Sequence, residues 1–213
     1  MGFGEPASSI SHMAGGGLSV VAAIFLLLAA EGPLAITSAA IFGASLIAAY
    51  TLSAVYHAFP KSSPAKKWLR RMDHVAIFLL IAGTYTPVVL VGLGGAWGWS
   101  LFGVVWGLAT LGIVLKLTVG AGPKWIQPVL YITLGWMVVI AAPAMLERVA
   151  TPALLWLLAG GVIYSVGAII YATHKQGKLW GLDGHDLWHF FVIGGSVCPV
   201  SYTHLTLPTI YSV

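Results

Sequence analysis

Long apolar runs separated by short polar breaks dominate the pattern of this sequence. Seven such runs lie at about residues 14–30, 34–57, 74–93, 98–117, 125–145, 153–172 and 185–200. None alternates apolar and polar residues as a barrel strand does, and a bilayer core takes roughly 20 apolar residues per helix. Because backbone groups in hydrocarbon must be hydrogen-bonded within their own segment, each run is predicted to be a transmembrane helix.

The composition agrees with this pattern and excludes a water-soluble domain. Hydrophobic residues make up 59% of the 213 residues, and charged residues make up 8%. The mean hydropathy is +0.93. The sequence therefore predicts an all-α polytopic membrane protein, a seven-transmembrane helical bundle with a single membrane domain over residues 1–200. The first run lacks the basic region and cleavage site of a secretory signal and is expected to be a retained span.

The basic residues predict which side of the membrane each loop faces. Nine of the ten Lys and Arg residues lie in or beside the even-numbered connections, and only Arg148 lies in an odd-numbered one. Cytoplasmic loops carry the excess of Lys and Arg, so a chain with seven spans has its N-terminus inside and its C-terminus outside. This topology also accounts for the formal net charge of +4, so no nucleic-acid partner is expected.

Histidines at the cytoplasmic ends of the predicted spans indicate a metal site, because an ionisable residue in lipid costs roughly 3 kcal/mol or more. His57 ends the second run, and His185 and His189 open the seventh. Residues four apart share a helical face, so His185 and His189 can bind one ion, and Ser53 shares a face with His57. Three histidine ligands and an open position for water are typical of catalytic zinc. Asp73, at the start of the third run, would bind that water or orient a ligand.

The sequence allows two interpretations of these histidines. They can be interfacial residues whose rings lie at headgroup depth, or ligands of one ion. Polar residues from four predicted helices, including His12, gather at one side of the membrane, and this convergence favours the metal. The seventh run lacks the glutamate of the HExxH zinc motif, so the general acid or base must come from elsewhere. Asp73 is expected to face the cluster, and its neighbour His74 to point elsewhere.

Several motifs resemble the bacterial hemolysin III proteins, which belong with the progestin and adipoQ receptors and, more distantly, the alkaline ceramidases. The matching pieces, in order, are Glu5, Ser11-His12, Ser53 to His57 with Phe59-Pro60, Arg70 to His74, Ile81 to Pro87, Gly135-Trp136 and His185 to Phe190. The resemblance implies seven spans that run N-in and C-out. It also implies a zinc ion held by His57, His185 and His189, with Ser53 and Asp73 near the zinc-bound water.

The end of the chain departs from this family. Its members usually continue the seventh span with a further histidine near position 199, whereas here Pro199 begins a Ser- and Thr-rich segment. Residues 201–213 are therefore expected to be an atypical tail, either foreign or disordered. The seventh helix would then have only about 15 residues, which is shorter than the hydrocarbon thickness. Cys198, the single cysteine, excludes an intrachain disulfide.

Three classes of function fit these features. The first is a zinc-dependent hydrolase of a lipid amide or ester bond, with Asp73 and Ser53 as catalytic residues and an interhelical cavity that holds the acyl chain. The second is a receptor or membrane-homeostasis protein with structural zinc. The third is a cytolytic protein, which is disfavoured because no amphipathic, secretable segment is present. Membrane lipids are the expected partners, in a bacterial inner or plasma membrane.

Overall fold

The computed structural model describes residues 4–119, 126–173 and 181–207, and its elements within those ranges are all helices. In chain order they are α1 (Pro6–Ala29), α2 (Gly32–Ala58), α3 (Lys66–Pro87), the π-helix η1 (Val88–Leu93), α4 (Gly95–Thr118), α5 (Ile126–Gly135), the 3₁₀-helix η2 (Met137–Ala141), α6 (Ala142–Arg148), α7 (Thr151–Thr173) and α8 (Gly184–Thr206). The all-helical fold is therefore confirmed.

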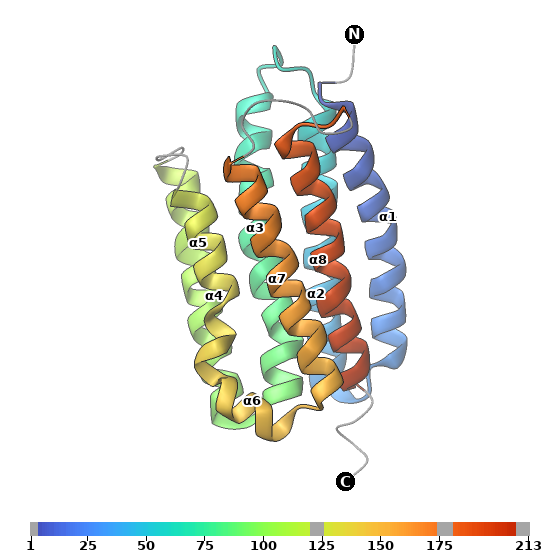
Figure 1. The fold of residues 1–213 in the computed structure, drawn as a ribbon, viewed down its shortest axis with the longest axis vertical. Helices are drawn as coiled ribbons and strands as arrows, with labels where there is room; N and C mark the ends of the chain where they lie inside the picture. Colours follow the sequence, from blue (N-terminus) through green and yellow to red (C-terminus); the bar gives the residue numbers. More distant parts are fainter. Residues whose placement is uncertain (1–3, 120–125, 174–180, 208–213) are drawn as a thin grey trace.

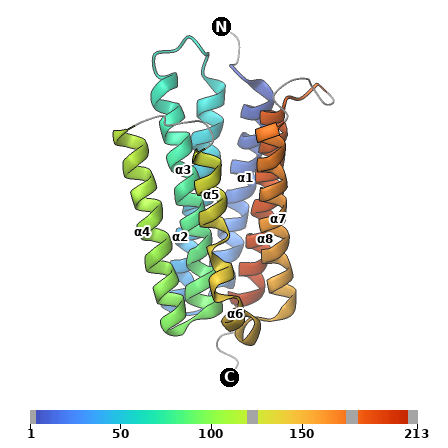
Figure 2. The same ribbon diagram turned by 60° about the vertical axis from the view of Figure 1, so that its left-hand side comes forward.

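Six helical segments in the described ranges are long and apolar enough to cross a membrane: Pro6–Ala29, Gly32–Ala58, Lys66–Leu93, Gly95–Thr118, Ile126–Arg148 and Thr151–Thr173. The segment Ile126–Arg148 consists of α5, η2 and α6, which follow one another along the bundle (Figure 2). The seventh predicted run lies in α8, a helix of 23 residues that is not among these six segments.

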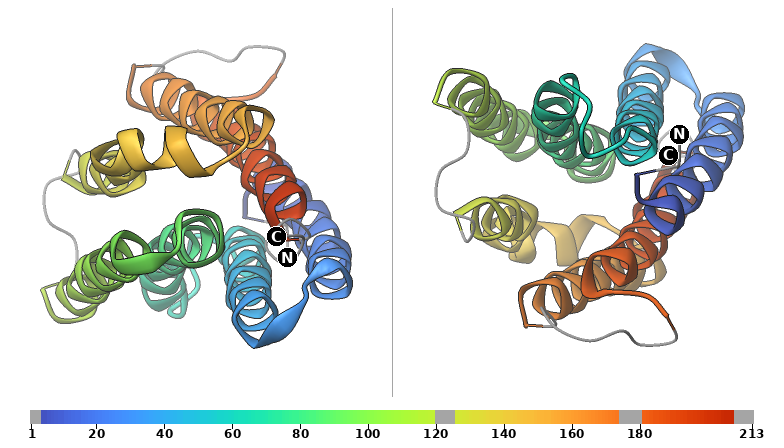
Figure 3. Two further views of the ribbon diagram at one scale, coloured as in Figure 1. Left: turned by 90° about the horizontal axis from the view of Figure 1, so that it is seen from below. Right: turned by 90° about the horizontal axis from the view of Figure 1, so that it is seen from above.

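The helices form one bundle in which the last helix lies beside the first (Figures 1 and 3). Along the chain α1 packs on α2, α2 on α3 and α3 on α4, whereas α8 packs on both α7 and α1. The beginnings of α1 and α8 and the connection from α2 to α3 lie at one end of the bundle, and α8 ends at the opposite end (Figure 1). Residues from both ends of the sequence thus meet at the same end of the molecule.

Large apolar side chains cover the outside of this bundle. Leu28 on α1 is 79% exposed and Leu146 on α6 is 73% exposed. A water-soluble monomer rarely exposes a continuous apolar surface, because hydration of that surface is unfavourable. The exposed apolar side chains therefore support the prediction of a protein whose outer surface faces lipid.

Several helices extend beyond the apolar runs that mark them in the sequence. α1 begins at Pro6 and α3 at Lys66, about two turns before their runs at about residues 14 and 74. Hydropathy identifies only the part of a helix that matches hydrocarbon, whereas the hydrogen-bonded backbone continues into polar sequence. The described ranges contain the basic cluster Lys61, Lys66, Lys67, Arg70 and Arg71, but Lys124, Lys175 and Lys178 lie outside them.

The expected end of the last helix is wrong. α8 continues through Pro199 to Thr206 and has 23 residues instead of about 15. Tyr202 is fully buried, and its hydroxyl donates a hydrogen bond to the carbonyl oxygen of Val88 at 3.4 Å. Packing against η1 therefore keeps residues 201–206 helical in spite of the proline.

Candidate metal centre

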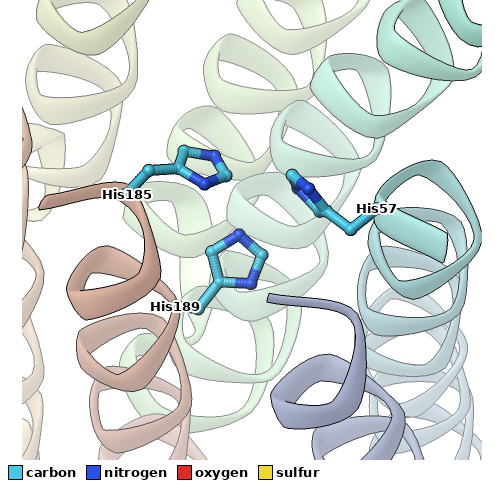
Figure 4. Close-up of side chains that lie close together, drawn as sticks. All are labelled: His57, His185 and His189. Atoms are coloured by element: carbon cyan, nitrogen blue, oxygen red, sulfur yellow. The ribbon is translucent and has the colours of Figure 1, made fainter. Parts of the chain in front are cut away.

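Three imidazoles converge where α2 ends and α8 begins (Figure 4). His57 lies in the last turn of α2, and His185 and His189 lie one turn apart at the start of α8. One ring nitrogen of each residue lies within 4.8 Å of those of the other two. The ring centroids of His57 lie 4.8 Å from His185 and 4.7 Å from His189. All three of the predicted ligands are thus brought together, from two helices far apart in sequence.

The start of α8 is fixed by a capping box. The carboxylate of Asp183 accepts hydrogen bonds from the backbone N–H groups of His185 and Asp186, both at 2.9 Å, and Asp186 caps the backbone N–H of Asp183 in return. This arrangement satisfies donors that a helix leaves free in its first turn. It therefore sets where α8 begins, and with it the positions of the two histidines.

Buried nitrogens without partners show that the cluster fits a metal ion. Nε2 of His57 and Nδ1 of His189 have no hydrogen-bond partner among the described residues, although their residues are only 1% and 2% exposed. An unsatisfied buried polar atom is unfavourable, and neutral imidazole nitrogens are common metal ligands. These two nitrogens and the ring of His185 would hold a divalent ion such as Zn²⁺.

A carboxylate that sequence reasoning did not assign to the site lies against His57. Oε2 of Glu5 is 2.6 Å from Nδ1 of His57, and the Glu5 carboxylate also lies 3.4 Å from Nζ of Lys61 and 3.6 Å from Nζ of Lys66. Burial raises the pKa of Glu5, but the hydrogen bond to His57 and the positive charge of Lys66 outweigh burial and hold the pKa below its usual value. Glu5 is therefore ionised at neutral pH.

Ser8 and His12, on α1, also touch the cluster. The hydroxyl of Ser8 donates to Oδ1 of Asp186 at 2.7 Å and lies 3.4 Å from Nδ1 of His185. The ring of His12 lies 3.7 Å from the ring of His189, centroid to centroid. The 5, 8, 12 spacing was available in the sequence, but its meaning depends on a helix that begins at residue 6 rather than near residue 14.

Asp73 and Ser53 lie beside the cluster. Ser53 is buried one turn before His57 and lies close to the carboxylate of Asp73. Asp73 lines a cavity of about 200 Å³ together with His57 and His185. It does not belong to the three-residue group whose ligand atoms converge. Its position therefore suits a partner of the site better than a ligand.

The expectation that His74 points away from the site is wrong. Arg70, Asp73 and His74 all line the same cavity. Arg70 lies three residues before Asp73 and four before His74, so all three can border one cavity although Asp73 and His74 are adjacent.

The walls of this cavity are mostly polar. They include Glu5, Ser8, Arg70, Asp183 and Asp186 besides the histidines and Asp73. Its volume of about 200 Å³ is smaller than the roughly 300–1,000 Å³ of pockets that enclose a drug-sized ligand. The cavity can therefore take water and a small polar group.

A second group of possible ligands overlaps the first. Asp183, His185 and Asp186 also offer atoms within 4.8 Å of one another. The carboxylate of Asp183 is already engaged as the cap of α8, and its side chain is exposed. The three histidines are therefore the better candidate for a metal site, because two of them are buried and none of them caps the helix.

Comparison with known proteins gives consistent matches over nearly the whole chain. The family model described as "Haemolysin-III related" matches residues 3–200. "Hemolysin-3" of Bacillus cereus is 36% identical over 197 residues, which cover 90% of this chain and 86% of that protein. "Hemolysin-3 homolog" of Bacillus subtilis (strain 168) is 36% identical over 195 residues, which cover 90% of this chain and 89% of that protein.

These matches confirm the resemblance that the sequence motifs indicate. Taken with the six long apolar helices, they identify a multi-pass bacterial membrane protein. The chain belongs to the haemolysin III-related family.

Proposed function

We propose that this protein is a zinc-dependent membrane hydrolase that cleaves an amide or ester bond of a lipid. The observation that carries the proposal is the convergence of His57, His185 and His189 beside a small polar cavity. Three histidine ligands leave a fourth position for water, which is the arrangement of catalytic rather than structural zinc.

The residues around the cluster have roles that follow from their positions. A bound zinc ion would activate water and polarise the carbonyl group of the substrate. Asp73 borders the cavity and is a hydrogen-bond acceptor, so it can orient a water molecule there and take its proton. Ser53 lies close to Asp73, so its hydroxyl can donate a hydrogen bond that orients this carboxylate.

The size of the cavity bears on how the substrate would bind. A polar space of about 200 Å³ takes the bond to be cleaved and its neighbouring polar groups, but not an acyl chain. The proposal therefore places the acyl chain along the apolar outer surface of the helices, within the membrane. Membrane lipids are the substrate class that reaches both places.

The orientation and the domain organisation complete the proposal. We infer seven spans, with α8 as the seventh, the N-terminus inside and the C-terminus outside. The basic cluster from Lys61 to Arg71 supports this, because it adjoins His57 and cytoplasmic loops carry Lys and Arg. The proposal treats residues 1–200 as one membrane domain, in keeping with a family match over residues 3–200. Residues 201–206 continue α8, so the atypical tail would begin after that helix.

A second candidate is a non-enzymatic receptor or membrane-homeostasis protein with structural zinc. The observation in its favour is His12, a fourth buried imidazole stacked on His189. A closed site with four protein ligands would indicate structure, whereas an open site with water would indicate catalysis. The names of the relatives, "Hemolysin-3" and "Hemolysin-3 homolog", suggest cytolysis as a third candidate. It can be tested by adding the purified protein to red cells.

The test combines metal analysis with a hydrolysis screen on purified protein in lipid nanodiscs. We expect about one zinc ion per chain and turnover of at least one lipid amide or ester substrate. His189→Ala should lose both, whereas His204→Ala, an exposed histidine near the far end of the same helix, should keep both. Zinc without turnover, with four protein nitrogens in the X-ray absorption spectrum, would favour structural zinc.

A further inference from the structure

The beginning of α1 presents one residue to each of the three imidazoles. Glu5 contacts His57, Ser8 contacts His185, and His12 contacts His189. Ser8 and His12 are four residues apart, so they share one face of the first turns of α1, and Glu5 is the N-cap residue just before them. A contact to every ligand from one helix face is more than packing alone requires.

We propose that this face of α1 is the outer shell of the metal centre, in which Glu5 is the positioning residue that orients His57. The inference rests on the metal site put forward as the proposed function. It adds a role for a helix that supplies none of the three ligands.

The geometry at His57 supports this role. The carboxylate of Glu5 can only accept a hydrogen bond, so at 2.6 Å the N–H group at Nδ1 of His57 is the donor to it. Nε2 is then the nitrogen that carries the lone pair, and it is the nitrogen without a partner among the described residues. The pairing of a carboxylate with a histidine ligand fixes both the tautomer and the orientation of the ring.

Glu5 is itself held in place by α2. Its backbone N–H donates to the carbonyl oxygen of His57 at 3.0 Å, and that of Gly4 donates to Ala58 at 3.3 Å. A Cβ atom at Gly4 would collide with the carbonyl oxygen of Phe59, so only glycine allows this approach. The segment before α1 is thus tied across the end of α2, with its carboxylate directed at the imidazole.

Ser8 influences His185, a ligand on α8, in a similar way. It has a single hydroxyl proton, which it donates to Asp186 at 2.7 Å, so its oxygen can only accept from Nδ1 of His185 at 3.4 Å. The chain from Asp186 through Ser8 therefore favours the tautomer in which Nε2 of His185 is free for the metal. Both ligands acquire the same tautomer, one directly from Glu5 and the other through Ser8.

Metal binding by Glu5→Gln tests the proposal, with Glu31→Gln as the matched control. Glu31 is an exposed glutamate that precedes α2 at the other end of that helix. We expect Glu5→Gln to weaken Zn²⁺ binding, measured by competition with a chromophoric chelator, by roughly 10–100-fold. The visible spectrum of its Co²⁺ form should change, and Glu31→Gln should match the parent in both measurements.

The melting temperature of the metal-free protein separates positioning from folding. If Glu5 positions His57, metal-free Glu5→Gln should have the same melting temperature as the metal-free parent. Ser8→Ala should also bind Zn²⁺ more weakly than the parent, and Glu5→Asp should recover part of the affinity that Glu5→Gln loses. Parent-like affinity and Co²⁺ spectrum in Glu5→Gln would overturn the inference and leave the metal site standing. A lower melting temperature with a parent-like Co²⁺ spectrum would overturn it as well. A parent that binds neither metal would remove the proposed function itself.

Discussion

A histidine nitrogen that is buried without a hydrogen-bond partner among the described residues is the residue-scale observation on which the proposed metal centre depends. His57 and His189 each bury one such nitrogen. The sequence could indicate the ligands themselves, because the spacings of Ser53 to His57 and of His185 to His189 place each pair on a helical face. It could not indicate Glu5 as the partner of His57, because that pair is 52 residues apart and its contact depends on how α1 crosses the end of α2.

At the same scale we predict that Asp73→Asn lowers hydrolysis more than zinc content. The substitution keeps the shape of the side chain but removes the group that would accept a proton from water in the cavity. A loss of roughly 10–100-fold in turnover is expected, with about one zinc ion per chain retained. Activity and metal content are to be measured on one preparation. Glu31→Gln, which removes an exposed acidic charge at the start of α2, far from the cavity, is the control, and equal turnover in all three proteins would exclude Asp73 from the reaction.

At the scale of elements, the helices carry information that hydropathy cannot supply. Within the described ranges each apolar run lies in a helical segment, but the runs misplace the start of α1 and the end of α8. The error matters for function, because Glu5, Ser8 and His12 lie before the first apolar run. A hydropathy pattern predicts a loop wherever the end of a membrane helix is polar. Capping and tertiary contacts nevertheless keep these polar turns helical.

The capping box of α8 gives a prediction at this scale. Asp183→Ala removes the side chain that accepts two backbone hydrogen bonds at the helix start, which typically costs about 1 kcal/mol. Because His185 belongs to that first turn, we expect weaker Zn²⁺ binding in a chelator competition. Asp183→Asn should restore binding, since Asn caps a helix as well as Asp does. Equal Zn²⁺ affinity in Asp183→Ala and the parent would show that the cap of α8 does not affect metal binding.

At the scale of the whole molecule, the order of helices around the bundle is what the sequence leaves open. Seven apolar runs of similar character do not specify which helices are neighbours, and α8 packs against α1 as well as α7. The motifs do indicate that His57 and His185 share one side of the membrane. The contact between the first and last helices, from which the outer residues of the site arise, follows only from the tertiary packing.

Because the ligands belong to two helices, removal of the metal should destabilise the whole bundle. At a free zinc concentration of about 100 times Kd, binding adds about 2.7 kcal/mol to stability. For a domain of this size that corresponds to a decrease of about 5–10 °C in melting temperature when a chelator is added. Thermal unfolding in nanodiscs measures the shift. A His57→Ala/His189→Ala double variant should melt at the same temperature with and without the chelator.

Orientation can be tested by chemical labelling from outside. In a Cys198→Ala background, Lys61→Cys lies in the connection between α2 and α3, and Glu31→Cys in the connection between α1 and α2. An impermeant maleimide added to spheroplasts should label Glu31→Cys alone and should reach Lys61→Cys only after lysis. The reverse pattern would put the histidine cluster on the outside.

The placement of the ligands on α2 and α8 also sets the order of events during biosynthesis. Residues 57 and 185 are separated by more than half of the chain, so ribosomal synthesis delivers Glu5 and His57 to the membrane long before His185 and His189. A nascent chain can therefore hold at most one of the three ligands until its last helix is inserted. At the proposed metal site, a chain truncated before α8 should therefore bind no zinc ion, because it lacks two of the three histidines.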